Sequence, residues 1–256
     1  SDSMQIIWPV QSPDGRWIVF SIQQGSDTYN LWVVPAGGGA PIQLTTGSHA
    51  DLYPTWFPSG DRIAFRSNRP SPPGEERYYI MTIPFDARTG RSAGPAQQVS
   101  LERANMPVVS PDGRWIVFGD WGQLMVVPSV GGAARTVVQV DGFNYTREWS
   151  PDGREIYFSA GLRGAPGRTL MRVSADSGPA QPLWSPPRRV TALNTTVRRV
   201  LTMPEVALPG SQVAQVSTFE GRPVANVPLH RNMRPSLSSS TGDGRSVLAE
   251  VSDVVA

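Results

Sequence analysis

The chain has 256 residues, enough for one large all-β domain, and its apolar runs are interrupted by 25 glycines and 25 prolines. It contains no cysteine, which excludes disulfides and thiolate metal sites, and no apolar stretch has the length of a membrane-spanning helix. The 23 basic residues are all arginine and are scattered over a chain of net charge +2, so no nucleic-acid partner is expected.

A turn motif recurs along the chain and is followed each time by a short apolar run. Residues 12–16 read Ser-Pro-Asp-Gly-Arg and precede Trp-Ile-Val-Phe at 17–20, and further copies, some altered, lie at 57–65, 110–118, 150–158 and 241–248. Proline presets the second turn position, aspartate accepts local hydrogen bonds, and glycine adopts the left-handed conformation. Each copy therefore predicts a tight turn between two antiparallel strands.

The spacing of the copies indicates the number of repeats. The turn glycines are Gly15, Gly60, Gly113 and Gly153, separated by 45, 53 and 40 residues, and Gly244 follows 91 residues later. A degenerate copy is therefore expected near residue 197, where the sequence keeps an arginine and an apolar strand but has lost the proline and glycine. Six copies of roughly 40 to 50 residues match the blades of a β-propeller.

Two further strands complete each repeat. A third strand is predicted at 30–34, 79–83, 123–127 and 169–173, each followed by a glycine-containing turn and a fourth strand. The chain is thus predicted to be a single all-β domain over 1–256, a six-bladed β-propeller of four-stranded antiparallel blades. The sixth copy has only two strands before residue 256, so the last blade is predicted to be incomplete.

These runs resemble the WD-like repeats of TolB-type β-propellers. The resemblance rests on Ser-Pro-Asp-Gly-Arg-Trp-Ile-Val-Phe at 12–20 and 110–118, each followed by Leu-Trp-Val-Val or Leu-Met-Val-Val and a glycine-rich turn. It implies a six-bladed propeller with a central funnel but no single function. Related propellers serve as protein-interaction modules in the bacterial periplasm, as gating domains of prolyl-oligopeptidase-like peptidases, and as sensor or accessory domains.

The cellular location is inferred from the same resemblance. A periplasmic or extracytoplasmic location is expected, and a cytoplasmic one stays open because a chain without cysteine suits either compartment. Residues 1–4 have neither the basic start nor the apolar stretch of a signal peptide, so none is expected there.

No pattern in the sequence points to catalysis. The two histidines, His49 and His230, are isolated, and neither a Gly-x-Ser-x-Gly motif nor a phosphate-binding loop is present. The aspartates of the repeat are assigned to the turns, and the other acids show no diagnostic spacing. The chain is therefore predicted to be no enzyme, with no catalytic residues, no metal site and no cofactor.

The tryptophans follow the repeat. Trp17 and Trp115 share one position of the motif, and Trp56 and Trp149 share another. Periodic placement predicts packing between blades, whereas a sugar-binding platform would not need it. The less periodic tryptophans, at 121 and 184, are the better candidates for exposure.

The segment entering each first strand differs between copies and carries polar and aromatic groups. In a propeller this crossover lies on the face where the funnel opens, and variation at a fixed repeat position is typical of binding specificity. The alternative is a solvated loop rim. The candidate binding residues on the funnel face are His49, Asp51, Tyr53, Arg103, Asn105, Asn144, Tyr145, Arg147, His230 and Asn232.

The expected function is a non-catalytic scaffold or sensor propeller that binds a protein or peptide at the funnel face, within a larger bacterial protein. The alternative is the substrate-gating propeller of a prolyl-oligopeptidase-like peptidase, or of another hydrolase, with its catalytic domain outside this chain. The sequence does not indicate the oligomeric state.

Overall fold

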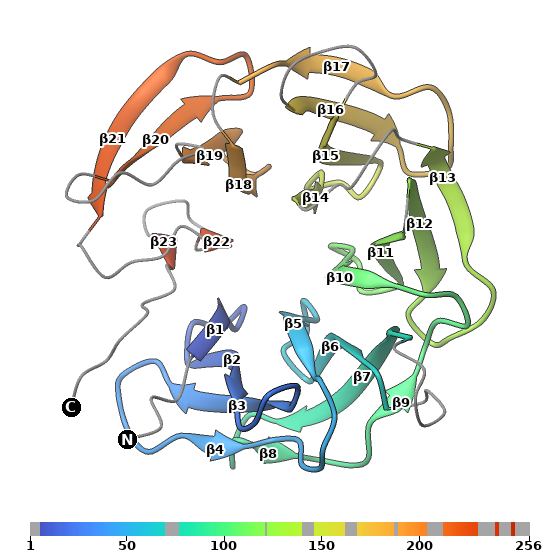
Figure 1. The fold of residues 1–256 in the computed structure, drawn as a ribbon, viewed down its shortest axis with the longest axis vertical. Helices are drawn as coiled ribbons and strands as arrows, with labels where there is room; N and C mark the ends of the chain where they lie inside the picture. The colour runs from blue at the N-terminus through green and yellow to red at the C-terminus, as the bar shows by residue number, and fades with distance from the viewer. Residues whose placement is uncertain are drawn as a thin grey trace. The chain divides into compact units, whose positions relative to one another are not determined.

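The chain folds into β-structure throughout the part that can be described. The computed structural model describes residues 6–69, 77–120, 122–139, 146–161, 168–186, 189–203, 212–229, 239–240 and 247–248. Every regular element within these ranges is a strand (Figure 1). No helix that could cross a membrane occurs among the described residues.

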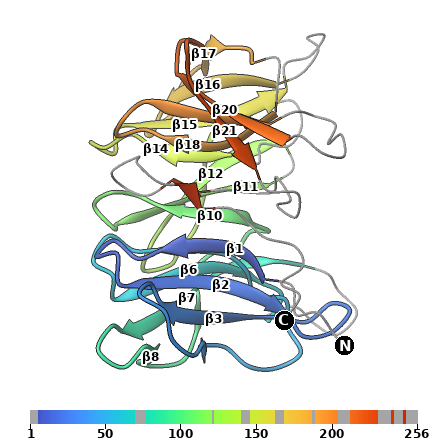
Figure 2. The same cartoon turned by 90° about the vertical axis from the view of Figure 1, so that its left-hand side faces the viewer.

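The first two blades are built from consecutive strands in the order of the chain. Blade 1 contains β1 (Ile6–Gln11), β2 (Trp17–Gln23), β3 (Tyr29–Pro35) and β4 (Ile42–Gln43). Blade 2 contains β5 (Leu52–Trp56), β6 (Arg62–Ser67), β7 (Tyr79–Asp86), β8 (Arg91–Ser92) and β9 (Gln97–Gln98). All their pairings are antiparallel, and β8 and β9 both pair with β7. Figure 2 shows β1, β2 and β3 running side by side.

Three further blades repeat this order. Blade 3 contains β10 (Asn105–Val109), β11 (Trp115–Asp120), β12 (Gln123–Pro128) and β13 (Arg135–Gln139). Blade 4 contains β14 (Arg147–Trp149), β15 (Glu155–Gly161), β16 (Arg168–Ser174) and β17 (Gln181–Trp184). Blade 5 contains β18 (Arg189–Asn194), β19 (Arg199–Met203), β20 (Gln212–Thr218) and β21 (Pro223–Leu229).

The expected count of six blades is wrong for this structure, which has five. The described residues of the sixth copy form β22 (Ser239–Ser240) and β23 (Val247–Leu248), which pair with each other in a two-stranded sheet. The count is wrong because it takes every copy of the turn motif as a blade, whereas the described residues of this copy contain two strands. The propeller architecture of four-stranded antiparallel blades is confirmed.

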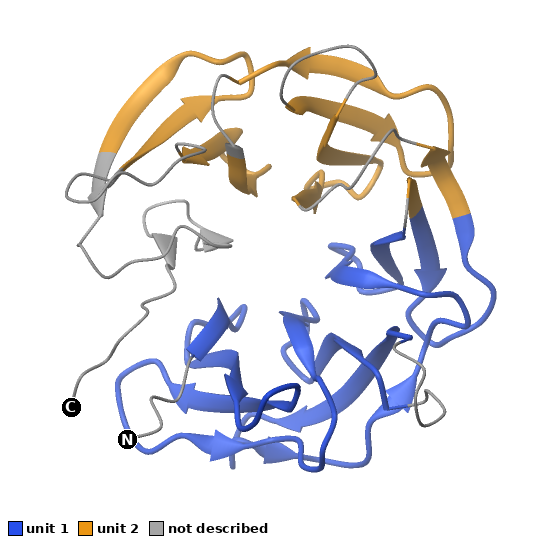
Figure 3. Cartoon of the chain, viewed as in Figure 1, with its two compact units in different colours: residues 1–120, 125–135, 253–256 blue, residues 121–124, 136–252 orange. Residues whose placement is uncertain are grey.

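The chain divides into two compact units, which are described separately (Figure 3). Unit 1 comprises residues 1–120, 125–135 and 253–256, and unit 2 comprises residues 121–124 and 136–252. Within unit 1, β1 contacts β5 and β5 contacts β10, and within unit 2, β14 contacts β18. First strands of successive blades therefore lie together, as propeller blades require.

The core consists of apolar layers between neighbouring blades. Val19 and Leu31 of blade 1 pack with Phe65 and Met81 of blade 2 in one cluster. Tyr157 and Leu170 of blade 4 pack with Val190, Val200 and Phe219 of blade 5 in another. A strand covered on both faces needs apolar residues at successive positions, which explains the uninterrupted apolar runs after each turn.

The repeat turn has the geometry that its sequence predicts. In the first copy the Ser12 hydroxyl donates to Asp14 Oδ1 at 2.6 Å and accepts from the backbone NH of Trp17 at 2.9 Å. The NH of Gly15 donates to the carbonyl of Ser12 at 2.9 Å, and Gly15 has φ of 72°. Hydrogen bonds from Ser12 and Arg16 lower the pKa of Asp14 to about 2. The aspartate therefore stays charged and closes the turn.

The predicted degenerate copy also forms a turn between two strands. Asn194 replaces the turn serine, and its Oδ1 accepts from the NH of Val197 at 3.1 Å. Arg198, one residue after the position of the lost glycine, takes the left-handed conformation, with φ of 50°. The fifth blade therefore keeps a turn between its first two strands, although the residue with positive φ is an arginine, which adopts this conformation less readily than glycine.

The first strands are not regularly extended. Trp8, Tyr53 and Met106 each precede a proline and have φ of 51°, 54° and 51°, in the left-handed region. The register of β1, β5 and β10 with its neighbour shifts at the same place, which marks a β-bulge. Non-glycine residues in this conformation cost about 1–3 kcal/mol each and persist only where packing holds them. Bulges of this kind redirect side chains.

Two of the periodic tryptophans, Trp17 and Trp56, pack between blades, as predicted for them. Trp17 donates from Nε1 to the carbonyl of Ala87 at 3.1 Å, and Trp56 donates to the carbonyl of Val10 at 3.0 Å, so each reaches the neighbouring blade. The expectation that Trp184 is exposed is wrong, because its ring is half-buried against Gly221 in the layer between blades 4 and 5. Trp121 lies outside the described residues.

Replacing Gly90 with alanine is expected to destabilise unit 1 more than the same change at Gly60. The two glycines have nearly equal φ, 69° and 71°, so the backbone cost of alanine is the same. A Cβ at Gly90 would lie 2.7 Å from Trp17 Cζ3 and 2.9 Å from Ile42 Cδ1, whereas nothing lies within 4 Å at Gly60. The difference in unfolding free energy, measured in urea, is expected to be about 1–3 kcal/mol. Equal costs would contradict the packing of Trp17.

Candidate functional site

Six of the ten predicted binding residues lie in the described part of the chain. His49, Asp51, Tyr53, Arg103 and Asn105 belong to unit 1, and Arg147 belongs to unit 2. Asn144, Tyr145, His230 and Asn232 lie outside the described residues. The structure brings Tyr53 and Asn105 to one place and gives Asp51 a different role.

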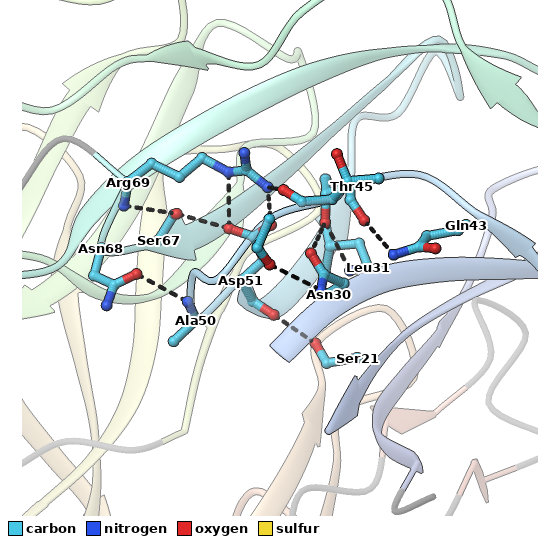
Figure 4. A network of polar contacts seen from close by, with 12 residues as sticks. Ser21, Asn30, Leu31, Gln43, Thr45, Ala50, Asp51, Ser67, Asn68 and Arg69 are labelled. Atoms are coloured by element: carbon cyan, nitrogen blue, oxygen red, sulfur yellow. Dashed lines mark hydrogen bonds and ion pairs between the residues drawn. The ribbon is translucent and has the colours of Figure 1, made fainter. Parts of the chain in front are cut away.

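Asp51 is fully buried between blades 1 and 2 (Figure 4). Its Oδ1 accepts from the Ser67 hydroxyl at 2.7 Å and from Arg69 Nε at 3.1 Å, and its Oδ2 accepts from Arg69 Nη2 at 2.5 Å. Its backbone carbonyl accepts from the hydroxyl of Ser21 at 3.1 Å. Both carboxylate oxygens are thus bonded within the protein, and the side chain has no exposed surface for a ligand.

The Asp51–Arg69 pair connects the end of blade 1 to blade 2. Arg69 Nη2 also donates to the carbonyl of Thr46 at 3.0 Å, in the crossover that leaves blade 1. The NH of Ala50 donates to Asn68 Oδ1 at 2.8 Å (Figure 4). The crossover is therefore fixed by groups from β6 and the residues after it.

Three of the predicted residues stay apart from this network. His49 is half-buried, and its backbone carbonyl accepts from the NH of Tyr29 at 2.8 Å. Arg103 is exposed, and Arg147 is buried in the first strand of blade 4. Their use as binding residues stays a prediction.

Tyr53 and Asn105 meet at Arg66, in a group of residues that we call the aromatic–arginine cluster. Arg66 Nη1 donates to Asn105 Oδ1 at 2.9 Å. The Arg66 guanidinium lies 3.5 Å from the ring centre of Tyr78 and 5.6 Å from that of Tyr53. The ring of Tyr53 in turn lies 4.0 Å from that of Trp8. The cluster comprises Trp8, Tyr53, Arg66, Tyr78 and Asn105, all half-buried and all in unit 1.

The topology explains why these residues converge. At one end of a blade the first strand begins, the second ends and the third begins. Trp8 and Tyr53 occupy the bulge of β1 and β5, Asn105 starts β10, Arg66 lies near the end of β6, and Tyr78 immediately precedes β7. Three blades therefore contribute to one cluster at the end where the crossovers enter.

The charge of Arg66 has no acidic partner among the described residues. No carboxylate of that part of the chain lies within ion-pair distance of its guanidinium, and burial is the main cause that lowers its pKa from the usual value. Tyr53 and Tyr78 act against that shift. The Nε of Arg66 and the Nε1 of Trp8 are shielded from solvent and have no acceptor in the described protein. The cluster thus holds one cation and two unmatched donors.

Comparison of equivalent positions in the repeats could have identified Trp8 and Arg66, which do not lie in the variable crossover segments. Trp8-Pro9 repeats the position of Tyr53-Pro54, so Trp8 shares the bulge. In blade 2, Arg66 of the second strand lies opposite Leu52 of the first. The equivalent residues of blades 1 and 3 are Ser21, opposite Ile7, and Gly119, opposite Asn105. An arginine where other copies have a small residue is a departure that comparison of the repeats could have found.

Unit 2 contains one carboxyl with an unusual pKa. Burial raises the pKa of Glu148, in the first strand of blade 4, to about 7, although the NH of Trp149 donates to its Oε1 at 3.1 Å and acts in the opposite direction. A lone carboxyl does not make a catalytic site. No group of three His, Asp or Glu side chains in the described ranges is placed to hold a metal ion.

Comparison with known proteins places this arrangement among propeller domains. The family model described as TolB beta propeller domain (PD40) matches residues 3–177. A structure titled putative TolB from Agrobacterium tumefaciens superimposes with a TM-score of 0.72 at 16% identity, covering 98% of this chain and 91% of that one. TolB from Acinetobacter baumannii gives a TM-score of 0.68 at 16% identity, covering 88% and 55%. At these identities the structures show the fold alone.

Curated relatives share only part of their length with this chain. The uncharacterised peptidase YuxL of Bacillus subtilis (strain 168) is 24% identical over 157 residues, which are 60% of this chain and 22% of the relative. The uncharacterised protein YidR of Escherichia coli (strain K12) is 28% identical over 127 residues, 46% of this chain and 26% of the relative. The chain thus spans about a quarter of the length of these relatives.

Proposed function

Since the chain belongs to the TolB β-propeller domain family, we propose that it is a non-catalytic binding module that takes up a peptide segment of a partner protein at the aromatic–arginine cluster. It acts as a scaffold or sensor within a larger bacterial protein, in the periplasm or elsewhere outside the cytoplasm. The family supports a binding role but not a particular partner.

The observation that supports this proposal is the convergence of three blades on one half-buried arginine. Trp, Tyr and Arg are the residue types that most often dominate binding energy at protein interfaces. Here Trp8, Tyr53 and Arg66 lie together, and their side chains are neither enclosed in the core nor fully solvated. The strained bulges at Trp8 and Tyr53 are the kind of feature that accumulates at ligand-binding positions.

Selection from a displayed library of random peptides on the immobilised chain tests the proposal. Peptides are expected to be enriched on the wild-type chain, and Tyr53→Ala is expected to weaken their binding about 30-fold, the effect of losing an interface residue worth about 2 kcal/mol. Val130→Ala is the control, because Val130 lies on an exposed turn with 89% of its surface accessible. Peptides that bind both variants equally would place recognition elsewhere.

A second candidate function is the gating propeller of a peptidase. The similarity to the uncharacterised peptidase YuxL favours it, because this chain aligns with 22% of that protein and leaves room for a catalytic domain. The test is the genomic sequence on both sides of this chain. A hydrolase domain in the same polypeptide would support gating, and its absence would exclude this candidate.

A further inference from the structure

The environment of Arg66 favours a particular chemical group in the partner, an inference that rests on the proposed function. A partly buried guanidinium ordinarily has a carboxylate beside it, because a desolvated charge without a counter-charge is costly. Arg69, three residues further along the chain, has Asp51. Within the described ranges, Arg66 has the amide oxygen of Asn105 and two tyrosines instead, and these do not neutralise its charge.

The unmatched polar atoms of the cluster are of one kind. Arg66 Nε and Trp8 Nε1 are both donors, and neither has an acceptor within the described protein. A buried donor without an acceptor costs about 1–3 kcal/mol. The partly exposed guanidinium of Arg66 is matched by a group that offers oxygen acceptors and a negative charge, since an amide or hydroxyl would leave the cation uncompensated.

The planar fork of arginine fits a carboxylate with two parallel hydrogen bonds. The ring of Tyr53 lies 5.6 Å from the Arg66 guanidinium, and the ring of Trp8 lies 4.0 Å beyond it, tilted by 34°, so the two rings offer an apolar surface to the residue next to that carboxylate. We propose that Arg66 binds a carboxylate of the partner peptide, either its C-terminal group or an Asp or Glu side chain, with Tyr53 and Trp8 contacting the adjoining residue.

Arg62 provides a matched control on the same strand. It lies at the opposite end of β6, and its guanidinium also covers an aromatic ring, that of Phe57, at 4.0 Å. Unlike Arg66 it has a carboxylate nearby, Asp61, at 3.9 Å. Replacing Arg62 therefore removes an arginine that lies over an aromatic ring but leaves the charge of Arg66 in place.

The experiment passes short random peptides, acetylated at the N-terminus, over the immobilised chain and measures retention by mass spectrometry. Three forms are compared: a free C-terminal carboxylate without Asp or Glu, a C-terminal amide with one Glu, and a C-terminal amide without any acid. Both carboxylate forms are expected to be retained at least tenfold better than the acid-free amide. The better retained of the two identifies the source of the carboxylate.

Substitutions test whether Arg66 causes the difference in retention. Arg66→Met is expected to abolish the tenfold difference, Arg66→Lys to retain part of it because the charge remains without the fork, and Arg62→Met to leave it unchanged. Thermal unfolding verifies that each variant is folded. Should Arg66→Met not fold, the salt dependence of the wild-type chain replaces it, because an ionic contact at a partly exposed site weakens as salt rises.

The outcomes separate the two proposals. Equal retention of all three forms, or a difference that persists in Arg66→Met or in high salt, would overturn the carboxylate assignment. Loss of that retention in Tyr53→Ala would then still support peptide binding at the cluster. No retention of any form would overturn the proposed function and this inference with it.

Discussion

Replacing Asp51 with alanine is expected to lower the free energy of unfolding by about 3–5 kcal/mol, because it leaves Arg69 without its partner and the Ser67 hydroxyl without an acceptor. The side chain of Asp51 is fully buried and that of Arg69 is 23% exposed, so water compensates poorly. Urea denaturation followed by tryptophan fluorescence measures the loss.

Two comparisons show whether the effect belongs to the buried pair. The double variant Asp51→Leu with Arg69→Met removes both charges and is expected to be more stable than either single variant, since no unpaired charge stays buried. Glu220→Ala breaks an exposed pair with Arg198, whose side chains are 57% and 51% accessible, and is expected to cost about 0–1 kcal/mol. A similar cost at Asp51 and Glu220 would contradict the network in Figure 4.

Glu148→Gln is expected to stabilise the protein above neutral pH. The pKa of Glu148 is about 7 in the folded chain and 4.5 as its ordinary value, so folding favours the protonated form. Its contribution to stability is complete below pH 4.5 and is lost as the pH rises through 7. The shift corresponds to an upper limit of about 3 kcal/mol, which partial exposure of the side chain reduces.

The difference between wild type and Glu148→Gln isolates this group from the aspartates of the repeat turns. The pKa of Asp112, like that of Asp14, is lowered to about 2, and such groups give the opposite dependence, with stability lost as the pH falls. Unfolding curves at pH 4.5 and pH 8 are expected to coincide for the two proteins at the lower pH and to separate at the higher. A constant difference at both would show that Glu148 titrates normally.

The blades could be predicted from the sequence because their signals are local. Ser12, Asp14 and Gly15 form their turn through hydrogen bonds that span five residues or fewer, so the motif alone specifies the geometry. The apolar runs after each turn predict strands covered on both faces. The count of six is wrong because it includes the sixth copy, whose blade the sequence itself predicts to be incomplete.

The site was predicted only in part because its contacts are not local. Tyr53 and Asn105 were identified from their place in the crossovers, but Arg66 joins them across blades through pairing that no short segment reveals. The same grounds predict Asp51 as a binding residue, whereas Ser67 and Arg69, on the next hairpin, bind its carboxylate and it is buried. The residue before a proline favours extension, and the bulges at Trp8 and Tyr53 override that preference.

The connection between Asp51 and Arg69 bears on how the chain acquires its structure during synthesis. Blade 1 contains its last strand by Gln43, but the crossover after it is fixed only once Arg69 has left the ribosome. A nascent chain ending between these residues would expose one apolar face of the first sheet. A partly synthesised chain is therefore expected to become stable only once it includes the second strand of the next repeat. The stable lengths would then not coincide with the boundaries between repeats.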